Sequence, residues 1–195
     1  MYCRRIGFIS VSFFLIIMIT HGCGSPAPKT GRTSGENPLF LQSNIHAQVG
    51  GRDTKASYAN WTDPGAGHII IPVNTPVEFG RYRRGFSIKI LNDGGLIYFE
   101  YNRRNMGMSA DQYIRLITSS EKVNLSELSE IDQKGIKSGK ALVGMSKKGV
   151  RIALGYPAAH RTPSLENNSW TYWRNRFRTK VIEFDREGKV KKVRF

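Results

Sequence analysis

The sequence predicts an α+β protein in which a small β-barrel precedes a domain of two helices and a three-stranded antiparallel sheet. Three observations lead to this fold class. Short apolar stretches recur between turn residues from 44 to 102, which is typical of strands in a small all-β module. Helix signals with capping residues follow from about residue 106. Beyond residue 140 a short helix precedes three strand candidates, and a run of helices beside a meander of strands indicates an α+β domain.

Residues 1–22 have the pattern of a secretory signal peptide rather than of a folded element. Arg4 and Arg5 form a basic start, and an apolar run of 14 residues covers 6–19. That run is shorter than the roughly 20 apolar residues needed to span a bilayer. We therefore expect this segment to be removed, with ordinary cleavage at another site or a retained anchor as the alternatives.

Cys23 is the expected lipidation site. Removal of the signal peptide would also remove Cys3, so Cys23 would have no thiol partner in the mature chain. Its position resembles a lipobox, although Thr20 and His21 are unusual there. The resemblance implies acylation by palmitate-type chains and, because Gly24 is not Asp, a lipid-anchored position on the periplasmic face of the outer membrane of a Gram-negative bacterium. Residues 23–40 are then a flexible tether, since 24–38 are rich in Gly, Ser, Pro and Thr.

The charge of the chain is strongly positive and unevenly distributed. The formal net charge is +15, and residues 140–195 hold 14 Lys and Arg against four acids. In an exported protein such charge favours anionic partners of the envelope, such as lipid or lipopolysaccharide head groups, peptidoglycan carboxylates or acidic proteins. Export argues against nucleic acid as the partner.

Residues 41–105 are expected to form the β module. Asn92-Asp93-Gly94-Gly95 separates two apolar runs and predicts a hairpin, because these residues tolerate positive φ. The stretch 71–77 resembles the entry strand of bacterial SH3-like modules, which implies an SH3-like barrel over about 44–102. The predicted strands are 45–49, 68–71, 76–79, 86–91 and 96–101.

Residues 106–131 are expected to form a helical connector. Ser109 and Gln112 make a capping box, and Tyr113, Leu116 and Ile117 form one apolar stripe that should end near Thr118. Leu125, Leu128 and Ile131 then repeat at helical spacing, and Ser129 with Asp132 makes a second possible capping box.

Residues 132–195 give the clearest domain prediction. Residues 132–140 should form one helix, and Ser146 should cap a second that Gly155 and Pro157 end. Strands are predicted at 170–174, 177–184 and 190–195. The run Gly144-Met145-Ser146-Lys147-Lys148-Gly149-Val150, then Leu154-Gly155-Tyr156-Pro157, Trp170-Thr171-Tyr172 and Ile182-Glu183-Phe184 resembles the SmpA/OmlA (BamE-like) lipoprotein domain of the outer-membrane β-barrel assembly machinery.

The resemblance implies an ααβββ domain in a small non-enzymatic lipoprotein that contacts assembly components. It also implies a structural role for Gly144, Ser146, Gly155, Pro157, Trp170 and Tyr172. The fold is similar to half of a tandem-repeat β-lactamase inhibitor as well, so an inhibitor-like function stays open. Roughly 100 additional residues before the domain distinguish this chain from the short assembly factor.

The candidate contact residues lie in the last third of the chain. Trp170 and Tyr172 have the same strand parity and Trp173 the opposite one, so one large ring should be buried and the other at least partly exposed. We expect Trp173 to be the exposed ring. The remaining candidates for protein or anion binding are the cations Arg174, Arg176, Arg178, Lys147 and Lys148.

No catalytic motif, metal site or cofactor is expected. The histidines lack metal-ligand spacing, and no motif of an activated nucleophile or a phosphate-binding loop occurs in the sequence. The leading expectation is a non-catalytic docking lipoprotein of the cell envelope, with barrel-assembly components among its candidate partners. The alternatives are a peptidoglycan-binding adaptor that uses the SH3-like module and a secreted enzyme inhibitor.

Overall fold

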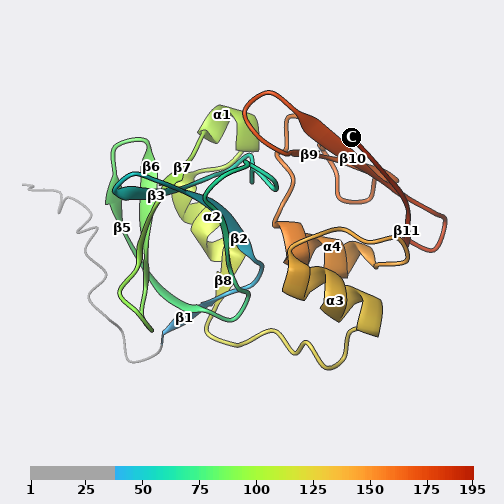
Figure 1. Cartoon of the computed structure of the whole chain (residues 1–195), viewed down its shortest axis with the longest axis horizontal. Coiled ribbons are helices and arrows are strands. Elements are labelled where there is room, and N and C mark those ends of the chain that lie inside the picture. Colours follow the sequence, from blue (N-terminus) through green and yellow to red (C-terminus); the bar gives the residue numbers. More distant parts are fainter. Residues whose placement is uncertain (1–37) are drawn as a thin grey trace, which may run out of the picture. The chain divides into compact units, whose positions relative to one another are not determined.

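The computed structural model describes residues 38–195, which contain eleven strands and four short helices (Figure 1). These described residues all belong to one compact unit. The expected signal peptide, Cys23 and all but the last residues of the expected tether lie outside the described residues. Within 38–195, no helix is both long enough and apolar enough to cross a membrane.

The larger sheet has eight strands and curls into half a barrel. Its order is β4-β2-β3-β7-β6-β5-β1-β8, with β3 parallel to β7 and every other pair antiparallel. The strands are β1 (Leu39–Leu41), β2 (Ile45–Gly50), β3 (Asp53–Ser57), β4 (His68–Ile71), β5 (Pro76–Tyr82), β6 (Gly85–Ile90), β7 (Leu96–Glu100) and β8 (Thr118–Ser119).

One face of this sheet packs against α2 (Ala110–Ile117), and together they form a hydrophobic core. Alternation along β6 and β7 buries Phe86, Ile88, Ile97 and Phe99, as the period-two pattern requires. Tyr113 of α2 contacts the rings of Phe86 and Phe99, and the short helix α1 (Arg103–Met106) contributes Met106. The helix therefore takes the place of the strands that would close a barrel.

A second layer follows in the sequence. It contains α3 (Glu130–Ser138), α4 (Lys147–Leu154) and a sheet of order β11-β10-β9. The three strands are β9 (Ser169–Trp173), β10 (Thr179–Phe184) and β11 (Val190–Arg194). Their inner faces pack on the two helices through Ile136, Met145, Val150, Ile152, Ala153, Leu154, Trp170, Tyr172, Ile182, Phe184 and Val190.

The predicted fold class is wrong. The chain is mostly sheet, with an eight-stranded half-barrel in place of a small SH3-like barrel, and it does not have the arrangement of a BamE-like ααβββ domain joined through helices. In addition, the side of α3 and α4 that faces away from the small sheet is not exposed to solvent throughout. Residues of the large sheet contact them, and Val73, in the loop between β4 and β5, is part of the core around these helices.

The end of α4 is hydrogen-bonded to Asn44 and to His46 at the start of β2, in addition to its cap at Gly155. The last carbonyls of a helix lack partners within the helix. The carbonyl of Ile152 accepts the backbone N–H of Asn44 at 2.8 Å, and the carbonyl of Ala153 accepts from Nδ2 of Asn44 at 3.3 Å and from Nε2 of His46 at 2.9 Å. The second layer therefore depends on side chains that lie more than 100 positions earlier in the chain.

Several local predictions are confirmed although the fold class is not. The capping box of Ser109 and Gln112 is present, Ser146 caps α4, and Gly155 follows its last residue with a φ of 77°. The hairpin between β6 and β7 forms, with Gly94 at a φ of 75°. Strands β1, β3 and β8 were not predicted.

Candidate functional site: the β9–β10 turn

The turn between β9 and β10 presents an aromatic ring between two arginines. Phe177 is 85% exposed, and Arg176 and Arg178 beside it are also exposed. The side chain of Asn175 holds the turn, because its Oδ1 accepts the backbone N–H groups of Phe177 and Arg178, both at 2.9 Å. The backbone N–H of Arg174 donates to the carbonyl of Arg178 at 2.7 Å. A large apolar ring is thus held in solvent on an ordered turn.

The base of the turn is joined to the loop after β3. Nη2 of Arg174 donates to Oδ2 of Asp63 at 2.6 Å. The carbonyl of Trp173 accepts both the backbone N–H and the hydroxyl of Thr62, at 2.9 and 3.2 Å. The hydrogen bond from Arg174 is the main cause that lowers the pKa of Asp63. The turn is therefore anchored on the large sheet.

The parity prediction for the aromatic residues of β9 is confirmed. Trp170 and Tyr172 are buried, at 2% and 1% exposure, whereas Trp173 is half-buried. Nε1 of Trp170 donates to the carbonyl of Leu165, and the hydroxyl of Tyr172 donates to the carbonyl of Gly155. Both rings thus have the positions that a structural role requires.

Trp173 lies at the junction of the two layers and is not a free ring. The guanidinium of Arg161 stands 5.5 Å from its centroid, and its Nε1 is buried without a hydrogen-bond partner. The exposed aromatic residue of the turn is Phe177, which the sequence did not single out. The predicted strand 177–184 began with Phe177, whereas β10 begins at Thr179 and leaves Phe177 in the turn. The interleaving of aromatic residues and arginines from 170 to 178 is the signal that could have identified it.

Lys147 and Lys148 differ in their surroundings. Nζ of Lys147 donates to the carbonyl of Glu166 at 2.9 Å and lies 5.5 Å from the ring centroid of Phe184, so this cation is used within the fold. Lys148 is exposed. Neither lysine belongs to the β9–β10 turn, and the structure does not bring the six predicted cation and aromatic candidates into one site.

The glycine-rich motif before α4 is built around a carboxylate that the sequence did not identify as important. Asp132 is buried, and its oxygens accept from the backbone N–H of Ser146 at 2.8 Å and from the hydroxyls of Ser146 and Ser129. A Cβ on Gly149 would lie 2.0 Å from Oδ1 of Asp132, so only glycine fits there. Gly144 has a φ of 90°, and Pro157 is buried, so the motif residues have structural positions.

A pair of histidines, the buried His46 and the half-buried His68, lies between β2, β4 and α4. Nε2 of His46 must donate to the carbonyl of Ala153, which can only accept, so Nδ1 of His46 accepts from Nε2 of His68 at 3.0 Å. Burial lowers the pKa of His46 to about 4. Buried groups with shifted pKa values often mark catalytic sites, but both ring nitrogens of His46 are already used. The pair ties the two layers together.

Lys180 of β10 is a second buried titratable group. Its side chain is on the inner face of the small sheet, and burial lowers its pKa to about 8, with Arg174 and Lys140 acting in the same direction. Asp63 acts against this shift.

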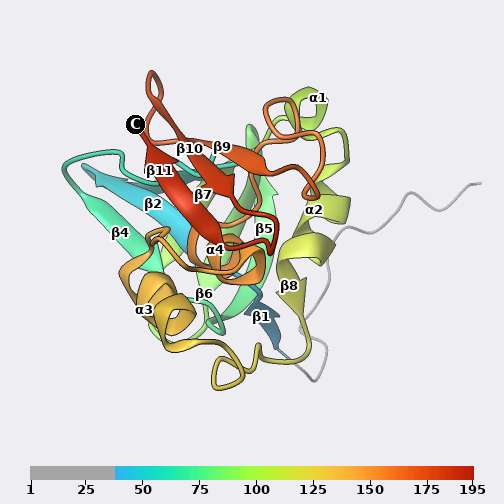
Figure 2. The ribbon, with the colours of Figure 1, turned by 90° about the vertical axis from the view of Figure 1, so that its right-hand side faces the viewer.

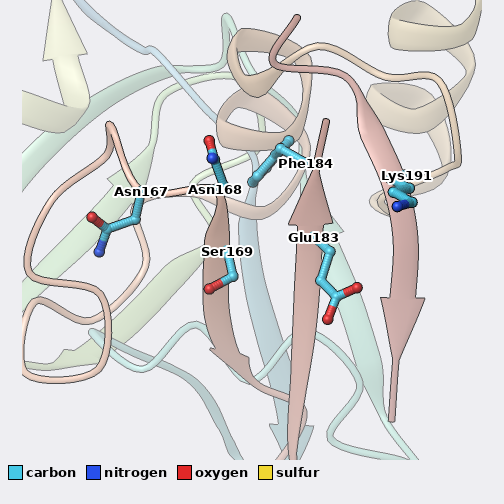
Figure 3. Close-up of a pocket in the computed structure, with 6 residues that line it drawn as sticks. All are labelled: Asn167, Asn168, Ser169, Glu183, Phe184 and Lys191. Carbon is cyan, nitrogen blue, oxygen red and sulfur yellow. The ribbon is translucent and has the colours of Figure 1, made fainter. Parts of the chain in front are cut away.

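Two hollows on the surface of residues 38–195 differ in their lining. One open depression crosses the small sheet, where Ser169, Glu183 and Lys191 stand on three neighbouring strands without converging on a point (Figure 3). Glu183 is already paired with Arg194 at 2.5 Å. A second, more apolar groove runs between α3 and the loop after β4. Among the described residues, no group of three or more His, Cys, Asp or Glu could hold a metal ion.

A second cluster of arginines lies in the half-barrel and was not identified from the sequence. Arg83 and Arg84 form the β5–β6 turn, and Arg103 and Arg104 begin α1; all four are exposed. The sequence signal is the pair of runs Arg81-Tyr82-Arg83-Arg84 and Arg103-Arg104. These four residues, Arg83, Arg84, Arg103 and Arg104, are called the arginine end below.

Comparison with protein-family models, with curated proteins and with solved structures finds no match to this chain. The resemblance of residues 132–195 to the SmpA/OmlA family therefore stays a prediction.

Proposed function

We propose that this protein is a non-catalytic docking lipoprotein of the cell envelope, anchored through Cys23 and binding a protein partner with the β9–β10 turn. The observation that carries the proposal is Phe177, an almost fully exposed ring between Arg176 and Arg178. Among residues 38–195, neither arginine has an ion-pair partner. Aromatic residues and arginine are the types that supply binding hot spots in protein interfaces.

The order of the turn supports a docking role. Binding is weakened when loops must be fixed on contact, whereas a turn that is already fixed avoids this entropic cost. Asn175 and the Arg174–Asp63 pair fix this turn before any partner arrives. The positive charge of the turn favours a partner with an acidic surface, and components of barrel assembly are candidates by the family resemblance alone.

The proposed anchoring at the membrane is tested by measuring whether Cys23 is acylated. Wild-type protein and Cys23→Ala are expressed with a radioactive fatty acid, and only wild type should carry label and sediment with outer membranes. Equal labelling of both proteins would exclude Cys23 as the anchor.

The docking role is tested by capture from detergent-solubilised envelopes. Phe177→Ala should reduce recovery of the partner by about tenfold or more, as expected for a hot-spot residue. Leu96→Ala is the matched control, because Leu96 is also an exposed apolar residue but lies on β7. Equal recovery with wild type and Phe177→Ala would exclude the turn as the contact. A captured enzyme that loses activity would instead support the inhibitor-like alternative.

A further inference from the structure

The arginine end is a single surface built from two segments. The backbone N–H of Tyr101 donates to the carbonyl of Arg84 at 2.9 Å, and Gly85 is paired with Glu100 across β6 and β7. This contact brings the β5–β6 turn next to the start of α1, two residues after Tyr101. Glu100 is the acid of this region, and its Oε1 lies 3.5 Å from Nη1 of Arg84. Four guanidinium groups and one carboxylate leave a local excess of positive charge.

Hydrogen bonds fix the start of α1. The side chain of Asn102 caps the helix by accepting the N–H of Asn105, and Gly107 ends it with a φ of 70°. Nδ2 of Asn105 donates to the hydroxyl of Tyr58 at 2.6 Å, and its carbonyl accepts the N–H of His160 at 3.0 Å. The arginines are therefore presented from an ordered support.

An aromatic pair lies beside the arginines on the outer face of the half-barrel. Tyr82 precedes Arg83, and its ring centroid is 5.0 Å from that of Tyr98. Tyr98 has the strand parity opposite to the buried residues Ile97 and Phe99. The residue paired with Tyr82 across the strands is Gly85, which has no side chain to cover the ring. Tyrosine offers an apolar face together with a hydroxyl for hydrogen bonds.

The arginine end and strand β1 are at opposite ends of the half-barrel. Helix α1 is in the upper part and β1 in the lower part of both views (Figure 1, Figure 2). The 15 residues from Gly24 to Pro38 reach at most about 50 Å when fully extended. In a body attached through β1, α1 therefore lies on the far side of the fold from the point of attachment, and a tether of this length leaves it free to reach away from the membrane.

From this arrangement we infer that the arginine end binds the peptidoglycan layer, a glycan polymer whose peptide stems carry carboxylates. Arginine binds carboxylates through two parallel hydrogen bonds, and all four cations are arginine rather than lysine. The tyrosine faces beside them suit sugar rings. This inference rests on the proposed envelope location, but it uses a different surface from the β9–β10 turn.

Sedimentation with insoluble peptidoglycan tests the inference. The protein lacks residues 1–22 and carries Cys23→Ser, so that no acyl chain contributes. Wild type should sediment, and Arg83→Gln/Arg103→Gln/Arg104→Gln should weaken binding by about tenfold or more, since three charge-assisted contacts are removed. The matched control, Arg186→Gln/Lys191→Gln/Lys192→Gln, removes the same charge from exposed positions in and beside β11 and should change binding less than about twofold.

Three outcomes would overturn the inference: wild type does not sediment, both triple variants lose binding equally, or the loss appears with phosphatidylglycerol vesicles instead of peptidoglycan. The last outcome would identify a membrane contact. Replacing the same three arginines by lysine should leave only part of the binding, because lysine keeps the charge but not the paired hydrogen bonds. Phe177→Ala should sediment like wild type, so a failure here is distinguishable from a failure of the docking proposal.

Discussion

Nη2 of Arg174 lies 2.6 Å from Oδ2 of Asp63, and this ion pair fastens the β9–β10 turn to the loop that follows β3. The two residues are 111 positions apart in the sequence, so the pair forms only when both sheets are in place. About a quarter of the Arg174 side chain and half of the Asp63 side chain remain accessible to water. The pair therefore contributes more to the position of the turn than to the stability of the fold.

Asp63→Asn tests this division of roles. We expect the free energy of unfolding to fall by less than about 1 kcal/mol, since the pair is partly exposed to solvent. Capture of the partner should weaken more clearly, because the turn loses its anchor. Thermal unfolding and the capture assay measure the two effects. Asp53→Asn, which removes a 3.9 Å pair with Lys55 in the half-barrel, should change neither; a large loss of stability in Asp63→Asn would contradict the assignment.

The histidine pair predicts a specific sensitivity to acid. The pKa of His46 is lowered from 6.5 to about 4 by burial, so between these values the unfolded chain binds a proton that the folded protein does not. The free energy of unfolding should therefore fall as the pH drops from about 6.5 to 4. Below pH 4 both states bind the proton, so His46 no longer contributes to the pH dependence of stability. Urea unfolding at a series of pH values measures it. His46→Gln should flatten the slope, whereas the exposed His160→Gln should keep it; parallel slopes in wild type and His46→Gln would exclude His46 as the cause.

Lys180 predicts a gain of stability on substitution. Burial lowers its pKa from 10.5 to about 8, so below pH 8 the folded protein holds a charged group that would be more stable in water. Lys180→Met should raise the melting temperature at pH 7, and the gain should shrink as the pH rises from 8 toward 10.5. Lys192→Met, at an exposed position of β11, should leave the melting temperature nearly unchanged. A lower melting temperature in Lys180→Met would show that the ammonium is stabilising.

Trp170 of β9 and Phe177 of the β9–β10 turn should affect the free energy of unfolding differently when each is replaced by alanine. Trp170→Ala removes a buried ring that packs on Phe184 at 4.8 Å between centroids, and it should destabilise by about 3–5 kcal/mol. Phe177→Ala removes an exposed ring and should stay within about 0.5 kcal/mol of wild type. Chemical unfolding compares them, and similar losses in both variants would mean that the ring of Phe177 packs in the fold.

Local signals predicted elements well and topology poorly. The caps at Ser109 and Ser146, the Gly155 stop and the hairpin around Gly94 depend on residues within a few positions, and all are present. Strand β1 has three residues and β8 has two, so neither shows a period. Strand β3 pairs in parallel with β7 across about 40 residues, and nothing local in Asp53–Ser57 indicates this partner.

The same limit explains the errors at the candidate site. Asp132 was expected only in a possible capping box with Ser129, because its hydrogen bond with Ser146 spans 14 residues and has no local signal. Trp173 was expected to be available to a partner, because neither its contact with Arg161 nor the hydrogen bond from Thr62, which is 111 positions earlier, has a local signal in the sequence. The arginine end is split between two runs that are about 20 residues apart and meet only through the pairing of β6 with β7.

Site-specific crosslinking tests most directly whether the β9–β10 turn is a docking surface. A photoreactive phenylalanine analogue is placed at position 177 or, as the control, at position 96, and intact cells are irradiated. We predict an adduct with an envelope protein from position 177, none from position 96, and loss of the adduct when Arg176 and Arg178 are also changed to Gln. An adduct that survives those substitutions, or no adduct from position 177 in cells where the protein reaches the membrane, would contradict the proposed function.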